Sequence, residues 1–234
     1  MHWTAVCAAQ RPGTYWYMLP QASQSRKAVW DAIDPHTGFR RIDTAFPKEL
    51  RTGTRENEML LKLRGGSTWQ VIGSDNFDSL VGSPPVGVVF SEWALSNPQA
   101  WAYLRPILRE NKGWALFNFT PRGRNHAVKM FEGHLHDPDW YCEKLTADQT
   151  NVFSRAELDT ELAEYKGENG PDDGEALFQQ EYYCDFDAPI VGGFYAKQLA
   201  TLSDNQGEFP YDPGAPVETA SDIGRTDDLC TVFY

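Results

Sequence analysis

Two stretches of the sequence decide the expected fold: GVVFSEWAL (residues 87–95) and WALFNFTPRGRNH (residues 114–126). Each begins with a short, continuous apolar run, which is the pattern of a strand buried on both faces of a parallel sheet. The run TYWYMLP (residues 14–20) is aromatic, rich in β-forming residues and closed by a proline, and it has the same character. We therefore predict three parallel strands in one sheet, at residues 15–19, 86–90 and 115–119.

Helical patterns and a hairpin fill the segments between these runs. Apolar residues recur at helical spacing over residues 22–33 and 101–110. The runs at 59–66 and 68–75 have the pattern of two strands joined by a Gly-Gly turn. Strands that alternate with helices at these lengths predict an α/β domain with a largely parallel sheet, which binds ligands at the carboxyl ends of its strands.

The second half of the chain differs in character. A helix is expected over residues 154–165, where Ser154 and Glu157 have the spacing of a capping box. Residues 166–175 are rich in Gly, Asp and Glu and are expected to form a loop. Residues 203–216 contain three prolines and two glycines, which is the composition of a linker between domains.

The charge is distributed unevenly along the chain. The 234 residues carry a formal net charge of −12, but residues 1–136 hold 16 Lys/Arg and 11 Asp/Glu, a balance of +5. Residues 137–234 hold 5 Lys/Arg and 22 Asp/Glu, a balance of −17. A nucleic-acid contact therefore belongs to the first half, because phosphates are attracted to basic surfaces. An acidic surface that only maintains solubility is the alternative explanation of the net charge.

Composition also restricts the cellular setting. Hydrophobic residues make up 41% and charged residues 23% of the chain, as in ordinary globular proteins. No apolar stretch approaches the roughly 20 residues of a membrane-spanning helix, and the N-terminus lacks the pattern of a secretory signal. The cysteines (Cys7, Cys142, Cys184 and Cys230) are widely spaced, which favours free thiols in a reducing cytoplasm over zinc binding or disulfides.

Glu92 is the first candidate catalytic residue. It follows the apolar run 87–90, at the point where a nucleotide hydrolase places the carboxylate that orients and deprotonates the attacking water. Thr120 ends another such run, and its hydroxyl can hydrogen-bond that water or a phosphate. An exposed glutamate that merely follows a strand is the alternative interpretation of Glu92.

A basic loop follows Thr120. Arg122, Arg124 and His126 can face phosphate, either in a nucleotide or in the DNA backbone. A solvated basic turn without a ligand explains this composition equally well. His126, His134 and His136 lie close in sequence, but their spacing matches no familiar zinc pattern, and we expect solvated loop histidines.

Asp222 is a candidate metal ligand. It lies two residues before Gly224 in a strand-like run, and hard carboxylate oxygens of this kind hold Mg²⁺ or Mn²⁺. An Asp-x-Gly turn without a metal is the common alternative. One carboxylate cannot form a metal cage by itself. A lone strand also leaves its backbone N–H and C=O groups unpaired, so we expect residues 218–234 to be disordered or to borrow a pairing partner from elsewhere.

The order and combination of these segments resemble the large subunit of tailed-phage DNA-packaging terminase along almost the whole chain. The resemblance rests on five segments in the family's order: YWYMLPQASQSRKAVWDAI, GGSTWQVIGSDNFDSLVG, GVVFSEWALSNPQAWAYLRPILRENKGWALFNFTPRGRNH, FQQEYYCDF and ETASDIGRTDD. It implies a P-loop-type ATPase domain of the additional-strand, catalytic-glutamate class over residues 1–202. A linker at 203–217 and the start of a ribonuclease-H-like nuclease domain at 218–234 are implied to follow.

The resemblance also implies roles for single residues. By position, residues 88–92 resemble the family's Walker B strand, with Glu92 as the catalytic base and with Ser91 and Glu92 as weak ligands of Mg²⁺-ATP. Thr120 resembles the coupling motif that passes the nucleotide state to DNA movement. Asp222 resembles the first metal-binding aspartate of the nuclease, which uses Mg²⁺ or Mn²⁺.

The implied function is that of the ATP-driven motor and endonuclease that packages and cuts viral double-stranded DNA. Its implied partners are double-stranded DNA, the portal protein, the small terminase subunit and further copies of the chain, with no membrane involved. The implied location is the host cytoplasm and, transiently, the procapsid portal. Arg122 and Arg124 are then the candidate DNA contacts.

Two departures from the family pattern matter. Ser91 stands where the family usually has aspartate, and a serine adds no negative charge for Mg²⁺. No GxxxxGK[ST] motif occurs in the sequence, so we expect the phosphate cradle before residue 1 and the later nuclease carboxylates beyond residue 234. We therefore expect these residues alone to be inactive. The alternative function is an inactive prophage remnant that at most binds DNA or a partner.

Overall fold

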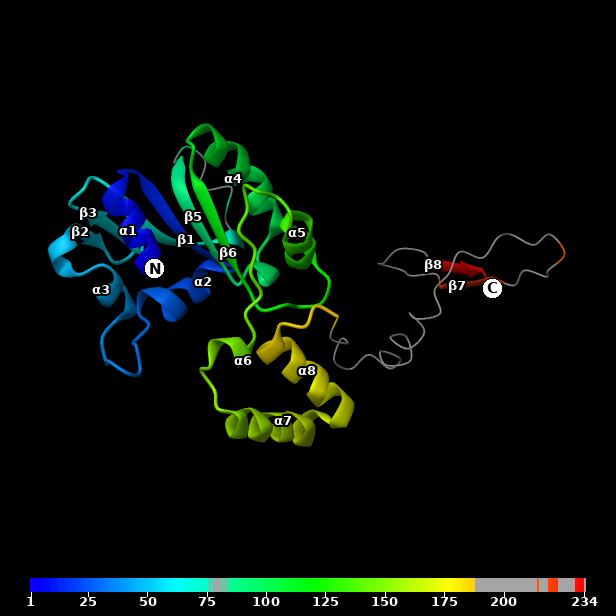
Figure 1. Ribbon diagram of the computed structural model, residues 1–234. Helices are drawn as coiled ribbons and strands as arrows, with labels where there is room; N and C mark the ends of the chain where they lie inside the picture. Colours follow the sequence, from blue (N-terminus) through cyan, green and yellow to red (C-terminus); the bar gives the residue numbers. More distant parts are fainter. Residues whose placement is uncertain are drawn as a thin grey trace. The chain divides into compact units, whose positions relative to one another are not determined.

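The computed structural model describes residues 1–75, 77, 82, 84–187, 214, 219–222 and 230–233. These residues belong to two units, Met1–Gly193 and Phe194–Tyr234, each of which is described by itself. The first unit holds an α/β sheet with its covering helices and a helical extension (Figure 1).

A mixed sheet forms the centre of the first unit. Within the described residues its strand order is β2-β3-β4-β1-β5-β6, and the four neighbours β4, β1, β5 and β6 run parallel. The strands are β1 (Thr14–Leu19), β2 (Arg51–Arg55), β3 (Leu60–Leu63), β4 (Thr68–Gly73), β5 (Pro85–Ser91) and β6 (Trp114–Asn118). The three strands predicted from apolar runs are confirmed as parallel neighbours, because β1 pairs with β5 and β5 with β6.

An antiparallel hairpin extends the sheet on one side. β3 pairs with β4, as the Gly-Gly turn predicts, and Gly66 has a φ of +85°, a left-handed conformation that favours glycine. β2 pairs antiparallel with β3 and forms one edge of the sheet. Its sequence, RTGTR, has no apolar residue, so hydrophobic periodicity does not predict this strand.

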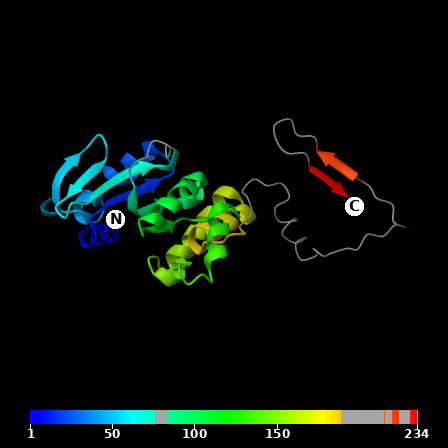
Figure 2. The same cartoon turned by 90° about the horizontal axis from the view of Figure 1, so that it is seen from above.

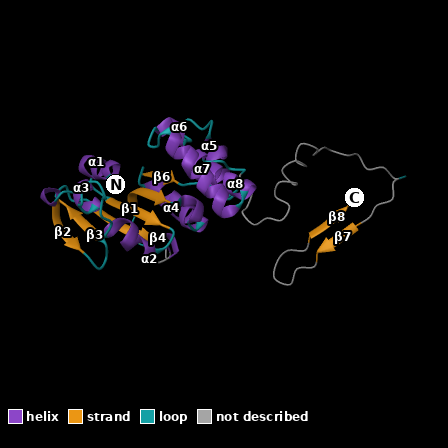
Figure 3. Ribbon diagram, turned by 90° about the horizontal axis from the view of Figure 1, so that it is seen from below, coloured by secondary structure: helices purple, strands orange, loops and turns teal. Residues whose placement is uncertain are grey.

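Helices cover both faces of the sheet (Figures 1 and 3). On one face, α1 (His2–Gln10), the π-helix η1 (Arg26–Trp30) and α3 (Arg41–Ala45) contribute to a core with β1, β3 and β4. On the other face, α4 (Pro98–Glu110) and α5 (His126–His134) contribute to a core with β1, β5 and β6. The first unit therefore has the layered helix–sheet–helix build that the α/β pattern predicts (Figure 2).

Large aromatic side chains fill both cores. Trp69 on β4 is fully buried, with its ring centroid 6.4 Å from that of Trp30 and 4.7 Å from that of Phe46. On the opposite face, Phe90 on β5 stacks on Phe117 on β6, with 4.8 Å between the ring centroids. Each such ring removes about 150–250 Å² from water, so these clusters are a major source of stability.

The two helices predicted between the strands are present with modified ends. In place of one helix over residues 22–33, α2 (Ala22–Ser25) continues into the π-turns of η1, which end at Trp30. Residues 101–110 lie in α4, as predicted. That helix begins earlier than its apolar pattern indicates, because the Asn97 side chain caps it.

Three helices form a helical extension with its own small core. They are α6 (Ala147–Thr150), α7 (Arg155–Asn169) and α8 (Pro171–Tyr183). Leu158 and Phe178 are buried in this core, and the predicted capping box of Ser154 and Glu157 is confirmed at the start of α7. We call α7 and α8 the acidic hairpin, because residues 155–183 carry nine Asp/Glu and two Lys/Arg.

The prediction of a loop at residues 166–175 is wrong. The end of α7 and the start of α8 occupy this segment, joined at Gly170, which has a φ of +88°. Most of this segment is exposed, so its polar composition is compatible with helix. Gly174 lets the two helices approach closely, since a Cβ there would lie 2.5 Å from the Cα of Lys166.

The second unit contains a short antiparallel strand pair, formed by β7 (Thr219–Asp222) and β8 (Cys230–Phe233). The expectation that residues 218–234 are disordered or borrow a partner from elsewhere is wrong, because this segment supplies both strands of the pair. The linker predicted at 203–217 lies outside the described residues apart from Gly214, so the predicted domain boundaries stay predictions.

The described part of the chain contains free thiols. Cys7, Cys142 and Cys184 are free thiols, and burial raises the pKa of the Cys7 thiol above its ordinary value. A thiol with a raised pKa forms little of the reactive thiolate at neutral pH. None of the helices in the described part of the chain is long and apolar enough to span a membrane.

Candidate active site at the carboxyl edge of the sheet

The candidate catalytic residues Glu92 and Thr120 follow two neighbouring parallel strands. Ser91, the last residue of β5, pairs with Asn118, the last residue of β6. Glu92 comes directly after Ser91, and Thr120 comes two residues after Asn118. Both residues therefore follow the carboxyl edge of the sheet, as predicted, and this is where α/β proteins bind ligands. Their catalytic roles stay predictions.

Glu92 turns the chain out of the strand in a left-handed conformation. Its φ and ψ are +57° and +46°, and such a conformation costs a non-glycine residue about 1 kcal/mol. The N–H of Leu95 and the hydroxyl of Ser96 donate to the Glu92 carbonyl, at 2.9 Å and 3.3 Å. The half-buried Glu92 carboxylate has no hydrogen-bond or ion-pair partner among the described residues, so it is available to a ligand. Backbone strain of this kind often marks a functional position.

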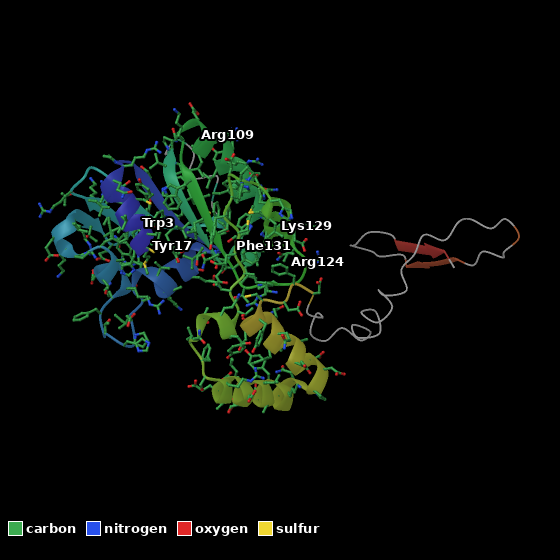
Figure 4. All side chains as sticks on the ribbon, in the orientation of Figure 1. Trp3, Tyr17, Arg109, Arg124, Lys129 and Phe131 are labelled. Atoms are coloured by element: carbon green, nitrogen blue, oxygen red, sulfur yellow. The ribbon has the colours of Figure 1, made fainter. Side chains whose placement is uncertain are left out.

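Ser91 is held by a tyrosine of the neighbouring strand. Tyr17 on β1 donates a hydrogen bond to Ser91 Oγ at 3.3 Å, and Ser91 is only 9% exposed. Figure 4 labels Tyr17 on β1, beside α1. Because the Ser91 hydroxyl is neutral, it offers an oxygen ligand without adding negative charge. Sequence patterns do not predict this contact, because the two residues are 74 positions apart.

The segment after β5 is anchored by the segment after β6. Asn125 Nδ2 donates to the carbonyl oxygen of Ala94 at 2.8 Å. The His126 ring nitrogen Nε2 lies 2.8 Å from the carbonyl oxygen of Trp93, so Nε2 carries a proton and donates it. The two segments that carry the candidate catalytic residues are thus joined by hydrogen bonds from side chains to backbone.

A buried serine ties the same segment to the other strands. Ser74 follows β4, is fully buried and donates to the Pro20 carbonyl oxygen at 3.0 Å. It also accepts a hydrogen bond from the Asn97 N–H at 3.1 Å. Asp75 is already engaged, since its Oδ1 accepts from the Ala22 N–H at 3.0 Å. The ends of β1, β4 and β5 are therefore held together before any ligand arrives.

Two of the three histidines pack against tryptophans. The His126 ring meets Trp93 edge to face, with 4.8 Å between centroids. The His134 ring centroid lies 4.0 Å from that of Trp140, and His134 Nδ1 is 2.9 Å from the Met130 carbonyl oxygen. The expectation of solvated loop histidines is wrong for both, because they are the first and last residues of α5 and face aromatic neighbours.

Carboxylates of the chain itself contact the two candidate DNA-binding arginines. Arg122 forms an ion pair with Glu181 on α8. Arg124, labelled in Figure 4, forms ion pairs of 2.6 Å with both Asp187 and Glu132. The hydrogen bonds that Arg124 donates to Asp187 and then to Glu132 raise the pKa of Arg124 above its ordinary value. DNA contact stays a prediction, and a phosphate that binds here has to replace a carboxylate.

The described residues contain few candidate metal ligands. Asp222 lies in β7 of the second unit, and its side chain is outside the described part of the structure. Within that part, no three His, Cys, Asp or Glu side chains gather in a way that would hold a metal ion. The Ser91 hydroxyl and the Glu92 carboxylate are hard oxygen ligands at one edge. Oxygen ligands of this kind would suit an Mg²⁺ ion that receives its remaining ligands from phosphates and water, and such a site stays a prediction.

A cavity of about 360 Å³ lies at the β2 side of the sheet. It is lined by Arg40, Asp43, Lys48, Arg51, Thr54 and Glu56. The nearly buried Arg51 pairs with Asp43 at 2.6 Å and donates to the Phe46 carbonyl oxygen. Arg40 pairs with Glu56 at 3.5 Å. Because these charges largely satisfy one another, we interpret this cluster as structural.

The fold and the edge together define an α/β domain whose parallel strands bring a carboxylate, a serine and a threonine to the carboxyl edge of the sheet, where proteins of this class bind ligands. No protein-family model matches the chain, and no curated protein matches it.

Solved structures of two phage proteins share this fold. The large terminase ATPase domain of Thermus phage P74-26 is similar with a TM-score of 0.54 and 21% identity, over 78% of this chain and 80% of that chain. The large terminase of another thermophilic bacteriophage, in complex with ATP-gamma-S, has a TM-score of 0.60 and 15% identity, over 100% of this chain and 54% of that chain. The complex of this second terminase with ADP has a TM-score of 0.57 and 16% identity, over 95% and 52%. The chain thus has the fold of a large-terminase ATPase domain and spans about half the length of the second terminase.

Proposed function

We propose that the chain is part of a phage terminase large subunit, the ATP-driven motor and endonuclease that packages and cuts viral double-stranded DNA. The observation that carries this proposal is Glu92, which leaves a buried parallel strand in a strained turn with its carboxylate unpartnered among the described residues. The fold supports the ATPase part, because one similar structure is a terminase ATPase domain and others contain ADP or ATP-gamma-S.

In this proposal Glu92 is the catalytic base. Its carboxylate orients the attacking water and accepts its proton, which contributes about 10²–10⁴-fold to the rate of hydrolysis. Thr120, after the neighbouring strand, hydrogen-bonds the same water or the terminal phosphate, so the loop that follows it responds to the nucleotide state. ATP and Mg²⁺ are the expected cofactors. Ser91 and Glu92 would hold the ion, which neutralises phosphate charge.

A phosphate cradle is the part of an ATPase site that these residues lack. The sequence contains no GxxxxGK[ST] motif, whose backbone N–H groups and lysine hold the phosphates of ATP. We infer that these residues by themselves bind ATP weakly and hydrolyse it slowly. The neutral Ser91 also weakens the binding of Mg²⁺-ATP, because a hydroxyl attracts Mg²⁺ less strongly than an aspartate does.

An inactive DNA- or partner-binding module is the second candidate function. The missing motif and the serine before Glu92 favour it, since both weaken nucleotide binding and leave the core of the fold intact. Such a protein would be a prophage remnant that keeps the α/β core without turnover.

Further parts of the proposal concern partners and the nuclease. The expected partners are double-stranded DNA, the portal protein, the small terminase subunit and further copies of the chain. They meet in the host cytoplasm and transiently at the procapsid portal. Arg122 and Arg124 would contact DNA phosphates, and Asp222 would hold Mg²⁺ or Mn²⁺ together with additional carboxylates.

Hydrolysis of Mg²⁺-ATP tests the ATPase proposal. We would compare the 234 residues with a longer chain in which an encoded GxxxxGK[ST] segment precedes them. We expect turnover only in the longer chain, where Glu92→Gln lowers kcat by about 10²–10⁴-fold and leaves ADP binding intact. The control Glu110→Gln, an exposed change at the end of α4, is expected to have no effect.

Full turnover in the Glu92→Gln chain would remove the proposed catalytic base. A longer chain that binds ATP but never hydrolyses it would favour the inactive module instead.

A further inference from the structure

The acidic hairpin and the segment directly after it contact the basic loop after β6 through two ion pairs. The basic loop is residues 121–125, PRGRN. Glu181, near the end of α8, pairs with Arg122, whose guanidinium also donates to the Pro121 carbonyl oxygen at 3.1 Å. Asp187, which follows α8, pairs with Arg124 at 2.6 Å. Two carboxylates from a distant part of the chain thus pair with the two arginines of this loop, and Glu132 on α5 pairs with Arg124 as well.

These carboxylates occupy guanidinium groups that the phosphates of bound DNA would contact. A carboxylate and a phosphate present similar charged oxygens to a guanidinium, so they compete for the same N–H groups. The Arg122 and Glu181 side chains are 35% and 30% exposed, and those of Arg124 and Asp187 are 53% and 69% exposed. Partly exposed ion pairs contribute little free energy, so a row of DNA phosphates is able to displace them.

The charge of the hairpin extends this effect beyond two contacts. Residues 155–183 carry nine Asp/Glu against two Lys/Arg. Such a surface repels DNA phosphates that come within a Debye length, which is about 8 Å at physiological ionic strength. Glu181 and Asp187 therefore occupy the arginines, and the charge of the hairpin also disfavours the approach of DNA to the loop.

We propose that the acidic hairpin, together with Asp187 directly after it, is an autoinhibitory cover over the DNA-binding surface formed by Arg122 and Arg124. DNA binds these arginines when its phosphates replace Glu181 and Asp187, and the end of the hairpin then separates from the basic loop. This inference rests on the proposed function, in which both arginines contact DNA. It adds that the chain carries its own competitor, so the DNA affinity depends on an exchange of anions.

The hairpin has contacts that keep it folded without these ion pairs. Leu158 and Phe178 are buried between α7 and α8. Tyr182 on α8 donates a hydrogen bond of 2.9 Å to Glu161 on α7. Substitutions that keep the shape of the two competing carboxylates therefore change the contact with the basic loop and leave the hairpin core in place.

Binding of a short, fluorescently labelled DNA duplex to the whole chain tests the proposal. Glu181→Gln combined with Asp187→Asn frees Arg122 from its carboxylate and leaves Arg124 paired with Glu132 alone among the described residues. We expect the DNA affinity to rise about tenfold. Glu164→Gln combined with Glu168→Gln is the matched control, because it removes the same charge from exposed positions on α7. We expect the control to raise the affinity by no more than about twofold, through the net charge alone.

Arg122→Gln combined with Arg124→Gln separates this inference from the proposed function. In the chain with Glu181→Gln and Asp187→Asn, these changes are expected to cancel the gain and to reduce the slope of log affinity against log salt by about 2. The autoinhibitory contact is refuted if the gain survives without the arginines, or if the carboxylate changes do no more than the control. If the arginine changes alter DNA binding in no background, the proposed DNA contact itself fails.

Discussion

The Tyr17 hydroxyl lies 3.3 Å from Ser91 Oγ and joins the central strand β1 to the last residue of β5. Tyr17 stands opposite Val89 in the parallel register, and Ser91 is the next residue along β5 on the same face. This hydrogen bond therefore fixes the strand end from which Glu92, the candidate catalytic base, turns away.

The first prediction concerns this hydrogen bond. Tyr17→Phe and Ser91→Ala are each expected to lower the free energy of unfolding by about 0.5–1.5 kcal/mol, because each removes the same part-buried bond. The double variant is expected to lose less than the sum, since the second change has no bond left to break. Urea unfolding of the four chains measures this coupling. Tyr103→Phe is the control, because the Tyr103 hydroxyl has no hydrogen-bond partner among the described residues. Strictly additive losses would show that the two hydroxyls do not interact.

The second prediction concerns the packing of the acidic hairpin at Gly174. An added Cβ would lie 2.5 Å from the Lys166 Cα and closer still to the Tyr165 carbonyl oxygen. We expect Gly174→Ala to destabilise the hairpin by about 1–3 kcal/mol, because backbone atoms have to move apart. Gly167→Ala is the matched control. Its Cβ meets nothing within 4 Å, so the change is expected to stabilise α7 by about 0.4–1 kcal/mol. Thermal unfolding followed by circular dichroism distinguishes the two, and equal effects would contradict the close approach.

The third prediction concerns the left-handed backbone of Glu92. Glu92→Gly removes a strain of about 1 kcal/mol, which offsets the greater freedom of glycine in the unfolded chain. We therefore expect the free energy of unfolding to stay the same or to rise, although the proposed catalytic carboxylate is lost. Glu164→Gly, in the middle of α7, is the comparison and is expected to cost about 1 kcal/mol. A loss of similar size at both positions would mean that Glu92 is not strained.

The fourth prediction concerns alkaline pH. Burial, followed by a hydrogen bond to Glu161, raises the pKa of Tyr182 from 10.0 to about 12. A group whose pKa is higher in the folded state stabilises the fold fully below its unfolded pKa. We therefore expect the hairpin to lose stability as the pH rises from 10.0 to about 12, and Tyr182→Phe to remove this part of the loss. Tyrosinate absorbance provides the direct measurement. The variant is expected to lack a step near the alkaline end of the titration, and a step that persists would assign it to another tyrosine.

Apolar periodicity is sufficient to predict the centre of this fold. Residues 86–90 read as a strand because helices pack on both faces of the sheet, so every position is apolar. The capping box at Ser154 is equally local, since its partner is three residues away. Because β5 and β6 are parallel, the common edge of Glu92 and Thr120 also follows from the sequence.

Other parts of the fold lie beyond such patterns. β2 is a strand because it pairs with β3, and its RTGTR sequence has no buried face to reveal it. The junction at Gly170 is polar because both helices there face solvent, which gives it the composition of a loop. The ion pair of Arg122 with Glu181 joins positions 59 apart, and only the folded chain brings such residues together.

The two edges of the sheet differ in a way that affects the protein in concentrated solution. Edge β2 carries two arginines, whereas β6, WALFN, carries no charge. Within the described residues β6 has a neighbouring strand on one side only, and Leu116 in its centre is 39% exposed. Charged side chains on an edge strand keep other strands from pairing with it, and an uncharged edge offers its free N–H and C=O groups as a template. If the chain self-associates through strand pairing, we expect the pairing to begin at Trp114–Asn118, while charge protects the opposite edge.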